Sequence, residues 1–466
     1  MRTGREYKMD KTPNKECIVK NYQELLSHGQ RKIREAALEI IQAGIKGANP
    51  GVGTYEAVKL SGNKLLVGKK EYDLRHINHI YVVGAGKGAL SIAESLEKIL
   101  GSYIHKGIVA AKKGDKRRLK RIEVIEAGHP IPDENSMIGA RKVLEIAKVA
   151  GEGDLVFAAI TGGSSALATL PPEGLKLEEM QQLTDLLLKS GAPIRDINAV
   201  RKHLSQIGGG LLISQIQPAE AITLTLDTKA KDLPWPDMCL PDPSTFQDAI
   251  DVLKYYELWD SVSPSIKDYL LEGTHRPEME TVKSFAGMKA TMIGVASPAR
   301  ACEAAAKQAA ELGYSPVILS THIDGEANVI GKCLAGIVRE ITENKRPFTP
   351  PCALISGGEM TVKVVGNGGV GGPNQEFVLG FALELGSRDK VCCASVDTDG
   401  SDGPTDIAGG IVDGETVTRA KRSNINIADF LKNHNSSAAL KTLEDTIVTG
   451  HTGTNIVDLR VILIDD

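Results

Sequence analysis

Short apolar runs alternate with stretches of helical periodicity along most of this chain, and this alternation limits the possible fold more than any other feature. The runs at 80–85 and 155–160 are apolar at nearly every position, which indicates strands buried on both faces. Such strands are typical of parallel sheets covered by helices on both sides. The sequence therefore predicts an α/β fold with a parallel sheet.

A chain of 466 residues is too long for a single hydrophobic core. The alternation weakens between about 228 and 285 and restarts with a strand–helix–strand pattern. We expect two α/β domains, residues 1–285 and 286–466, with ligands bound between them. Local patterns also predict a first helix at 20–46, a helix capped by Asp133, and a β-hairpin at 352–366.

Charge and cysteine content argue against several classes of function. The formal net charge is only -4, which gives no reason to expect a nucleic-acid or membrane partner. The seven cysteines are scattered without a C-x-x-C pair, so neither a disulfide framework nor a structural zinc site is predicted. No apolar run is long enough to cross a bilayer, and we expect a cytoplasmic protein.

A glycine-rich turn follows the apolar run at 80–85 and contains Gly84, Gly86, Lys87 and Gly88. Its spacing, G-x-G-x-G, differs from the dinucleotide fingerprint, and it also lacks the first glycine and the Ser/Thr of a phosphate-binding Walker loop. A glycine turn at a helix start that carries an ammonium group suits a phosphate or a carboxylate. The alternative is a tight turn with Lys87 in solvent.

A second turn of the same kind follows the run at 155–160. It offers backbone amides and hydroxyl groups from Thr161, Gly162, Gly163, Ser164 and Ser165. This composition favours an oxyanion cradle, although an ordinary Ser/Thr helix cap would look the same. Because the carboxyl ends of parallel strands lie at one edge of a sheet, both turns are expected to face one crevice. Arg201, on the next basic helix, is a further candidate for that crevice, against a solvated basic face.

Acidic residues gather in the second half of the chain. Asp397, Asp399, Asp402 and Asp406 lie within ten residues at the end of a predicted strand. Such a group of carboxylates suits a divalent cation, with Asp397 and Asp399 as the predicted ligands, or proton transfer by Asp399 or Asp402. Other candidates for binding substrate or nucleotide stand near glycines: Glu359, Asn374, Gln375, Glu376, Thr452 and Asn455. A basic crevice facing an acidic one is the division of charge that phosphoryl transfer needs.

The sequence resembles the glycerate 2-kinases of the MOFRL-containing family from about residue 20 onward. The segments that carry the resemblance occur in the family's order, and they include VVGAGKGAL, GHPIPDENS, TGGSSAL, INAVRKHLS, PDPSTF, ISGGEMTV, GGPNQEF, DTDGSDGPTDIAG and HTGTNIVDLRV. The resemblance implies a Rossmann-like N-terminal domain, a C-terminal MOFRL-type domain, and a kinase that phosphorylates D-glycerate on its 2-hydroxyl group with ATP and Mg²⁺. Mn²⁺ has the same preference for hard oxygen ligands.

The resemblance also assigns roles to the basic residues and shows one departure from the family. Lys87 stands at the family's active-site lysine, where it would bind the substrate carboxylate or the transferring phosphate. The family usually carries an arginine where this chain has Pro373, so Arg201 or loop amides would have to hold that anion. Only small-molecule partners are implied, and a homodimer is left open.

Two other functions are compatible with parts of the pattern. An NAD(P)H-dependent hydroxypyruvate reductase would use the first glycine turn, but the misplaced glycine and the missing acidic residue on the next strand oppose it. A non-catalytic sensor of small phosphorylated acids would keep the basic crevice. It would gain nothing from the added carboxylates.

Overall fold

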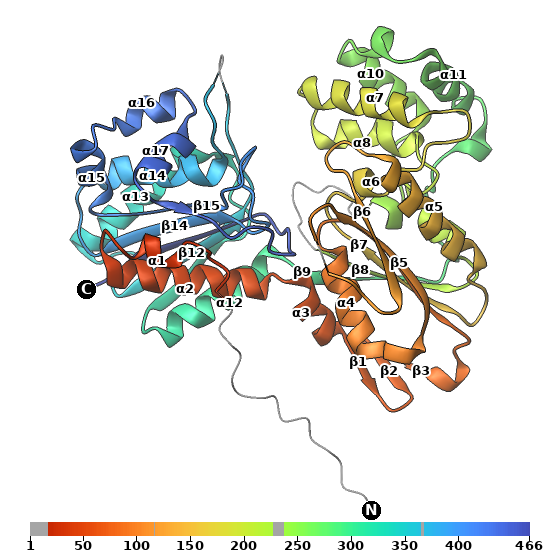
Figure 1. Ribbon diagram of the computed structural model, residues 1–466, viewed down its shortest axis with the longest axis horizontal. Helices are drawn as coiled ribbons and strands as arrows, with labels where there is room; N and C mark the ends of the chain where they lie inside the picture. Colours follow the sequence, from red (N-terminus) through yellow and green to blue (C-terminus); the bar gives the residue numbers. More distant parts are fainter. Residues whose placement is uncertain (1–16, 116, 227–236, 365–367) are drawn as a thin grey trace, which may run out of the picture.

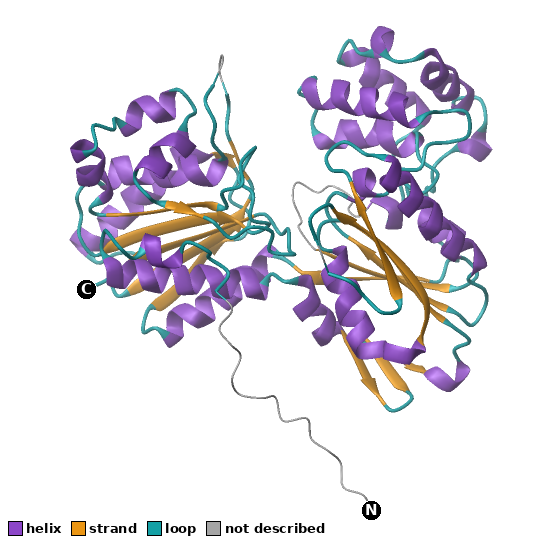
Figure 2. Ribbon diagram, in the orientation of Figure 1, coloured by secondary structure: helices purple, strands orange, loops and turns teal. Residues whose placement is uncertain are grey.

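The computed structural model describes residues 17–115, 117–226, 237–364 and 368–466. They form two lobes that lie side by side, here called the N-lobe and the C-lobe, each built on its own sheet with helices packed against it (Figures 1 and 2). The α/β fold with two domains is therefore confirmed. No helix among these residues is long and apolar enough to cross a membrane.

The N-lobe sheet has the strand order of a Rossmann fold. Its described strands are all parallel and lie in the order β6-β5-β4-β7-β8-β9, which is 3-2-1-4-5-6 in chain order. They span β4 (Ile80–Ala85), β5 (Ile104–Lys112), β6 (Ile122–Ala127), β7 (Leu155–Ile160), β8 (Glu220–Leu226) and β9 (Ala290–Ala296). The order reverses between β4 and β7, and ligands bind at this switch point in such folds.

Helices cover this sheet because its strands are apolar on both faces: β4 and β7 are buried at every position. The covering helices are α3 (Pro50–Ala57), α4 (Ala89–Leu100), α5 (Glu134–Val149), α6 (Ser164–Leu167) and α9 (Leu211–Ile216). Asp133 caps α5 as predicted, since its carboxylate accepts from the amide of Ser136. A small antiparallel sheet completes the base of the lobe with β1 (Val58–Ser61), β2 (Lys64–Val67) and β3 (Lys70–Asp73).

A group of helices forms the far end of the N-lobe, at the upper right of Figure 1. It consists of α7 (Leu177–Lys189), α8 (Ile194–His203), α10 (Phe246–Tyr255) and α11 (Pro264–Gly273). These helices share a hydrophobic core of their own, which includes Leu183, Val200, Phe246 and Leu270.

The C-lobe sheet is mixed, in the order β10-β12-β17-β14-β15-β16. Its strands are β10 (Ser315–Ser320), β12 (Cys352–Gly358), β14 (Val391–Asp397), β15 (Gly409–Asp413), β16 (Thr446–Ile447) and β17 (Asp458–Ile464). One face carries α13 (Ala327–Asn344), α14 (Pro373–Leu385), α15 (Thr416–Arg422), α16 (Ile427–Lys432) and α17 (Ser436–Thr442). The other carries α1 (Tyr22–Leu25), α2 (Arg31–Gly47) and α12 (Pro298–Glu311) (Figure 1).

The chain passes from one sheet to the other after β9, which ends at Ala296, a little beyond residue 285. The strand β9 pairs with β8 in the N-lobe, and the first long helix, α2, packs its apolar face on β14 and β17 of the C-lobe. We infer that the N-lobe comprises about 50–296 and that the N-terminal helices belong to the C-lobe.

The predicted hairpin at 352–366 is wrong. The strand β12 pairs with β10 and β17, while the short strand β13 (Met360–Thr361) pairs in parallel with β11 (Gly325–Glu326). The sequence identified the first strand, which runs through Gly357 and Gly358, but the residues that follow it pair with β11 and do not fold back onto β12.

Candidate active site between the two lobes

The two predicted glycine turns pack against each other at the switch point of the N-lobe sheet. Gly86 has a φ of +133°, and a Cβ at this position would lie 2.2 Å from Oγ1 of Thr161. The same Oγ1 accepts a hydrogen bond of 2.9 Å from the amide of Gly88. Gly84 lies inside β4, where a Cβ would stand 2.9 Å from the carbonyl oxygen of Ala159. These glycines therefore permit close packing of the protein on itself.

The backbone of the first turn is already hydrogen-bonded within the protein. The amides of residues 86–88 donate to the carbonyl oxygens of Ala110 and Gly162 and to the Thr161 hydroxyl, at 3.2, 2.8 and 2.9 Å. The amides of residues 86–88 are therefore not free to bind an anion. The contribution of this turn to the crevice is the side chain of Lys87.

The second turn is more open to a ligand. Within the described residues, the amides of Gly162 and Gly163 donate no hydrogen bond to the protein. Gly163 has a φ of +85°, and a Cβ there would lie 2.9 Å from the ring of His129. The hydroxyl of Ser164 is buried without a partner among the described residues, and Ser165 is half-buried. The turn offers amides for an oxyanion, whereas Ser164 faces the interior.

Lys87 makes an ion pair across the two lobes. Its Nζ lies 2.9 Å from Oδ2 of Asp399, which follows β14 in the C-lobe. The side chain of Lys87 is 17% exposed and that of Asp399 is 6% exposed, so the pair is largely screened from water. Two residues that the sequence placed in separate crevices, 312 positions apart, therefore share one site.

Three carboxylates gather at this end of β14. Asp397 stands opposite Asp458 in the pairing of β14 with β17, and its Oδ1 accepts from the amide of Asp399 at 2.9 Å. Burial, and then the charges of Asp399 and Asp458, hold the pKa of Asp397 well above its ordinary value. Asp458 also binds Arg460 at 2.9 Å. Asp458 and Arg460 were not predicted, because both lie inside β17 and no local sequence signal marks them.

A divalent cation would relieve the mutual repulsion of these carboxylates. Mg²⁺ needs only one or two protein carboxylates when phosphates supply other ligands. Among the described residues no three His, Cys, Asp or Glu side chains are placed so that they could hold a metal ion by themselves. Asp397 and Asp399 therefore suit an ion shared with a ligand better than a closed structural site.

Asp402, a candidate for proton transfer, lies beside the start of α14. Its oxygens accept from the backbone amides and side-chain amides of Asn374 and Gln375, at 3.0 to 3.1 Å, at the start of α14. Burial raises the pKa of Asp402 to about 6, against these hydrogen bonds. All three side chains are fully buried. Asp402 holds the N-terminus of α14, and the predicted binding roles of Asn374 and Gln375 have no support in these contacts.

The two glutamates among the C-lobe candidates differ in their exposure to solvent. Glu376 is buried beside His434 and Asn328, whereas Glu359 is exposed between β12 and β13. Pro373 occupies the first position of α14, where its ring suits the helix start. That position therefore supplies no cation, so any second cation of the site comes from elsewhere.

The loop before β17 brings the last candidates to the lobe interface. The hydroxyl of Thr452 donates to the carbonyl oxygen of Thr398, beside Asp399. A Cβ on Gly162 would lie 2.9 Å from Nδ2 of Asn455, and the carbonyl oxygen of Gly453 accepts from Ser91 at 3.0 Å. This loop therefore packs directly on the N-lobe turns.

His129 belongs to the same site and was missed. Burial, and then the positive charges of Lys87, Lys112 and Arg201, lower its pKa to about 4, so its ring is neutral near pH 7. The segment GHPIPDENS was noticed in the sequence, but nothing local indicates that its histidine meets Lys87. Arg201 lines a cavity of about 20 Å³ with Ser165 and Asp237, so it lies close behind the second turn.

The comparisons with known proteins identify the family. Residues 36–271 match the family described as "Domain of unknown function (DUF4147)", and residues 352–458 match the MOFRL family. The chain is 41% identical to "Glycerate 2-kinase" of Pyrococcus horikoshii over 93% of its own length and 97% of that protein. The chain belongs to the MOFRL-containing glycerate 2-kinase family.

Two further comparisons bear on this family. A solved glycerate kinase of Thermotoga maritima is 37% identical and superimposes with a TM-score of 0.79, covering 93% of this chain and 99% of that one. A "Putative hydroxypyruvate reductase" of Agrobacterium vitis is 36% identical over 82% of this chain and 98% of that protein. The family's members thus carry both names that the sequence analysis considered.

Proposed function

We propose that this chain is an ATP-dependent kinase that phosphorylates D-glycerate on its 2-hydroxyl group, giving 2-phosphoglycerate and ADP. The observation that carries the proposal is the Lys87–Asp399 pair. It places a cationic side chain of the N-lobe beside the carboxylates of the C-lobe. Phosphoryl transfer depends on positioning and on neutralising the charge of the phosphates. Family membership supports the same reaction.

In this proposal the N-lobe binds the negative charges. Lys87 and Arg201 stabilise the substrate carboxylate and the transferring phosphate, and the amides of Gly162 and Gly163 offer further donors. The neutral ring of His129 fills the space beside Gly163 without adding repulsion to the cations. Pro373 has no charge to contribute, so Arg201 is our choice for the second cation.

The C-lobe supplies the carboxylates. Asp397 and Asp399 would hold Mg²⁺ or Mn²⁺, which neutralises charge on the phosphates when bound. Asp399 is the nearer group to Lys87 and is the better candidate for orienting or deprotonating the attacking hydroxyl. Asp402 acts indirectly in this scheme, since it fixes the start of α14. A homodimer and a cytoplasmic location stay predictions.

The reductase alternative has less support from the geometry. A dinucleotide pyrophosphate is bound by free amides at the helix start after the first strand. Here the amides of residues 86–88, which precede α4, already donate hydrogen bonds within the protein.

The reaction is tested by incubating the protein with D-glycerate, ATP and Mg²⁺ and recording phosphorus NMR spectra. We expect the resonance of 2-phosphoglycerate without that of the 3-isomer. L-Glycerate and a reaction without metal are the controls. No phosphorylated product, together with oxidation of NADH or NADPH on addition of hydroxypyruvate, would replace the kinase by the reductase.

The metal role is tested by changing Asp399 to Asn, which keeps the shape and removes the charge. We expect the Mg²⁺ concentration for half-maximal activity to rise by about tenfold or more. Asp406, exposed nearby, gives the matched control Asp406→Asn, which should leave the metal titration unchanged. An unaltered titration in Asp399→Asn would move the role to another carboxylate.

A further inference from the structure

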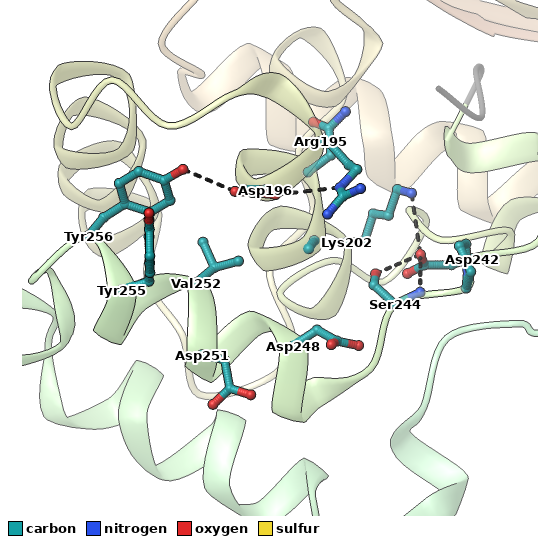
Figure 3. Close-up of a pocket in the computed structure, with 13 residues that line it drawn as sticks. Arg195, Asp196, Lys202, Asp242, Ser244, Asp248, Asp251, Val252, Tyr255 and Tyr256 are labelled. Atoms are coloured by element: carbon teal, nitrogen blue, oxygen red, sulfur yellow. Dashed lines mark hydrogen bonds and ion pairs between the residues drawn. The ribbon is translucent and has the colours of Figure 1, made fainter. Parts of the chain in front are cut away.

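A second cavity lies in the helical end of the N-lobe, between α8 and α10 (Figure 3). Its volume is about 540 Å³, which is within the usual range for a site that takes a small molecule. Neither Lys87 nor Asp399 lines it, so it is separate from the candidate active site.

The cavity has an excess of negative charge. Two cationic and four carboxylate side chains line it, a formal sum of −2, from Arg195, Lys202, Asp196, Asp242, Asp248 and Asp251. Both cations already have carboxylate neighbours: Nζ of Lys202 lies 3.3 Å from Asp242, and Nε of Arg195 lies 3.6 Å from Asp196. An anion would therefore meet no unpaired positive charge.

Two carboxylates on α10 lack a cationic partner among the described residues. Asp248 accepts from the amide and the hydroxyl of Thr245 at the start of the helix, and Asp251 accepts from the side-chain amide of Gln247 at 2.8 Å. Both are exposed on the side of α10 that lines the cavity (Figure 3).

An aromatic surface adjoins these carboxylates. Tyr255 is 80% exposed, and its ring stands at 81° to that of Tyr256 with the centroids 4.9 Å apart. The hydroxyl of Tyr256 donates to Asp196 at 3.1 Å, which orients the pair, and Val252 lies between them and α8 (Figure 3). A tyrosine face beside a carboxylate is a favourable environment for an ammonium or guanidinium group on an apolar body.

The helix α8 connects this cavity with the candidate active site. Lys202 lines the cavity between α8 and α10. The preceding residue, Arg201, lines the small cavity behind the second glycine turn, and its positive charge helps to lower the pKa of His129. Asp242 joins Lys202 to Thr281, whose hydroxyl donates to it at 3.0 Å. A ligand that holds α8 against α10 therefore also holds the backbone of Arg201 in place.

We propose that the cavity between α8 and α10 binds an organic cation with an apolar body, and that its occupation holds Arg201 in place through α8. The cationic head meets Asp251 and Asp248, and the body lies on Tyr255. The second part of the proposal rests on the proposed kinase function, and the first does not.

Three probes of the same shape test the binding: 2-phenylethylamine, 2-phenylethanol and phenylacetate, which carry a positive, a neutral and a negative head. Isothermal titration calorimetry on the full chain should detect the amine and give a clearly weaker signal, or none, for the other two. Asp251→Asn and Tyr255→Leu should each weaken amine binding by about fivefold to tenfold. Asp268→Asn, an exposed carboxylate of α11 outside the cavity, should not.

Equal binding of the three probes, a preference for phenylacetate, or amine binding unchanged in Asp251→Asn and Tyr255→Leu would overturn the site. The coupling is tested separately, since saturating amine should raise kcat/KM for glycerate by about fivefold. An unchanged kcat/KM in an active enzyme that binds the amine would overturn the coupling. Calorimetry needs no turnover, so loss of the kinase proposal would leave the binding result intact.

Discussion

Replacing Lys87 by Met is expected to lower kcat by about 10²–10³-fold while leaving the fold intact. Methionine keeps the unbranched stem, so the packing beside Gly163 remains, but the ammonium that faces the C-lobe carboxylates is lost. An interaction with the transferring group is stronger in the transition state than in the ground state, so the effect should fall on kcat more than on KM.

The measurement is a steady-state assay of glycerate phosphorylation, with circular dichroism to verify the fold. Lys98→Met is the matched control, because Lys98 is exposed on the helix that follows the same turn and pairs only with Glu94 among the described residues. Activity of Lys87→Met within a few fold of the parent would remove Lys87 from the catalytic scheme.

Replacing Arg34 by Met is expected to lower the free energy of unfolding by about 3–5 kcal/mol. Arg34 is fully buried on α2, and its guanidinium binds Asp413 at 3.0 Å and Asp445 at 2.6 Å. Burial lowers the pKa of Arg34, but these two carboxylates raise it above its ordinary value, so the group is charged. Without it, two buried carboxylates lose their main counter-charge.

Urea unfolding of the full chain, followed by circular dichroism, measures the effect. Lys32→Met, on the exposed side of the same helix, is the control and should change the stability by less than about 0.5 kcal/mol. A loss below about 1 kcal/mol in Arg34→Met would mean that Arg419, which lies 2.6 Å from Asp445, compensates for the missing charge.

Most elements were predictable because their signals are local. The strands β4 and β7 are apolar throughout, and the cap at Asp133 lies next to the helix that it starts. The side to which α2 packs was not predictable, since an amphipathic helix shows that one face is buried but not which sheet buries it. The partners of Arg34 were not predictable either, since Asp413 and Asp445 lie 379 and 411 residues away in the sequence.

Prediction from the sequence has the same limit for the individual side chains of the candidate site. The sequence by itself determined the residue types that the crevice offers: a lysine in a glycine turn, hydroxyls after the next strand, and aspartates after a strand of the second half. Only the tertiary structure decided which of them meet. Lys87 faces Asp399, the amides of residues 86–88 are used inside the protein, and Asp402 caps α14. Hydrogen-bond partners depend on distances across the fold, and residue spacing along the chain carries no record of those distances.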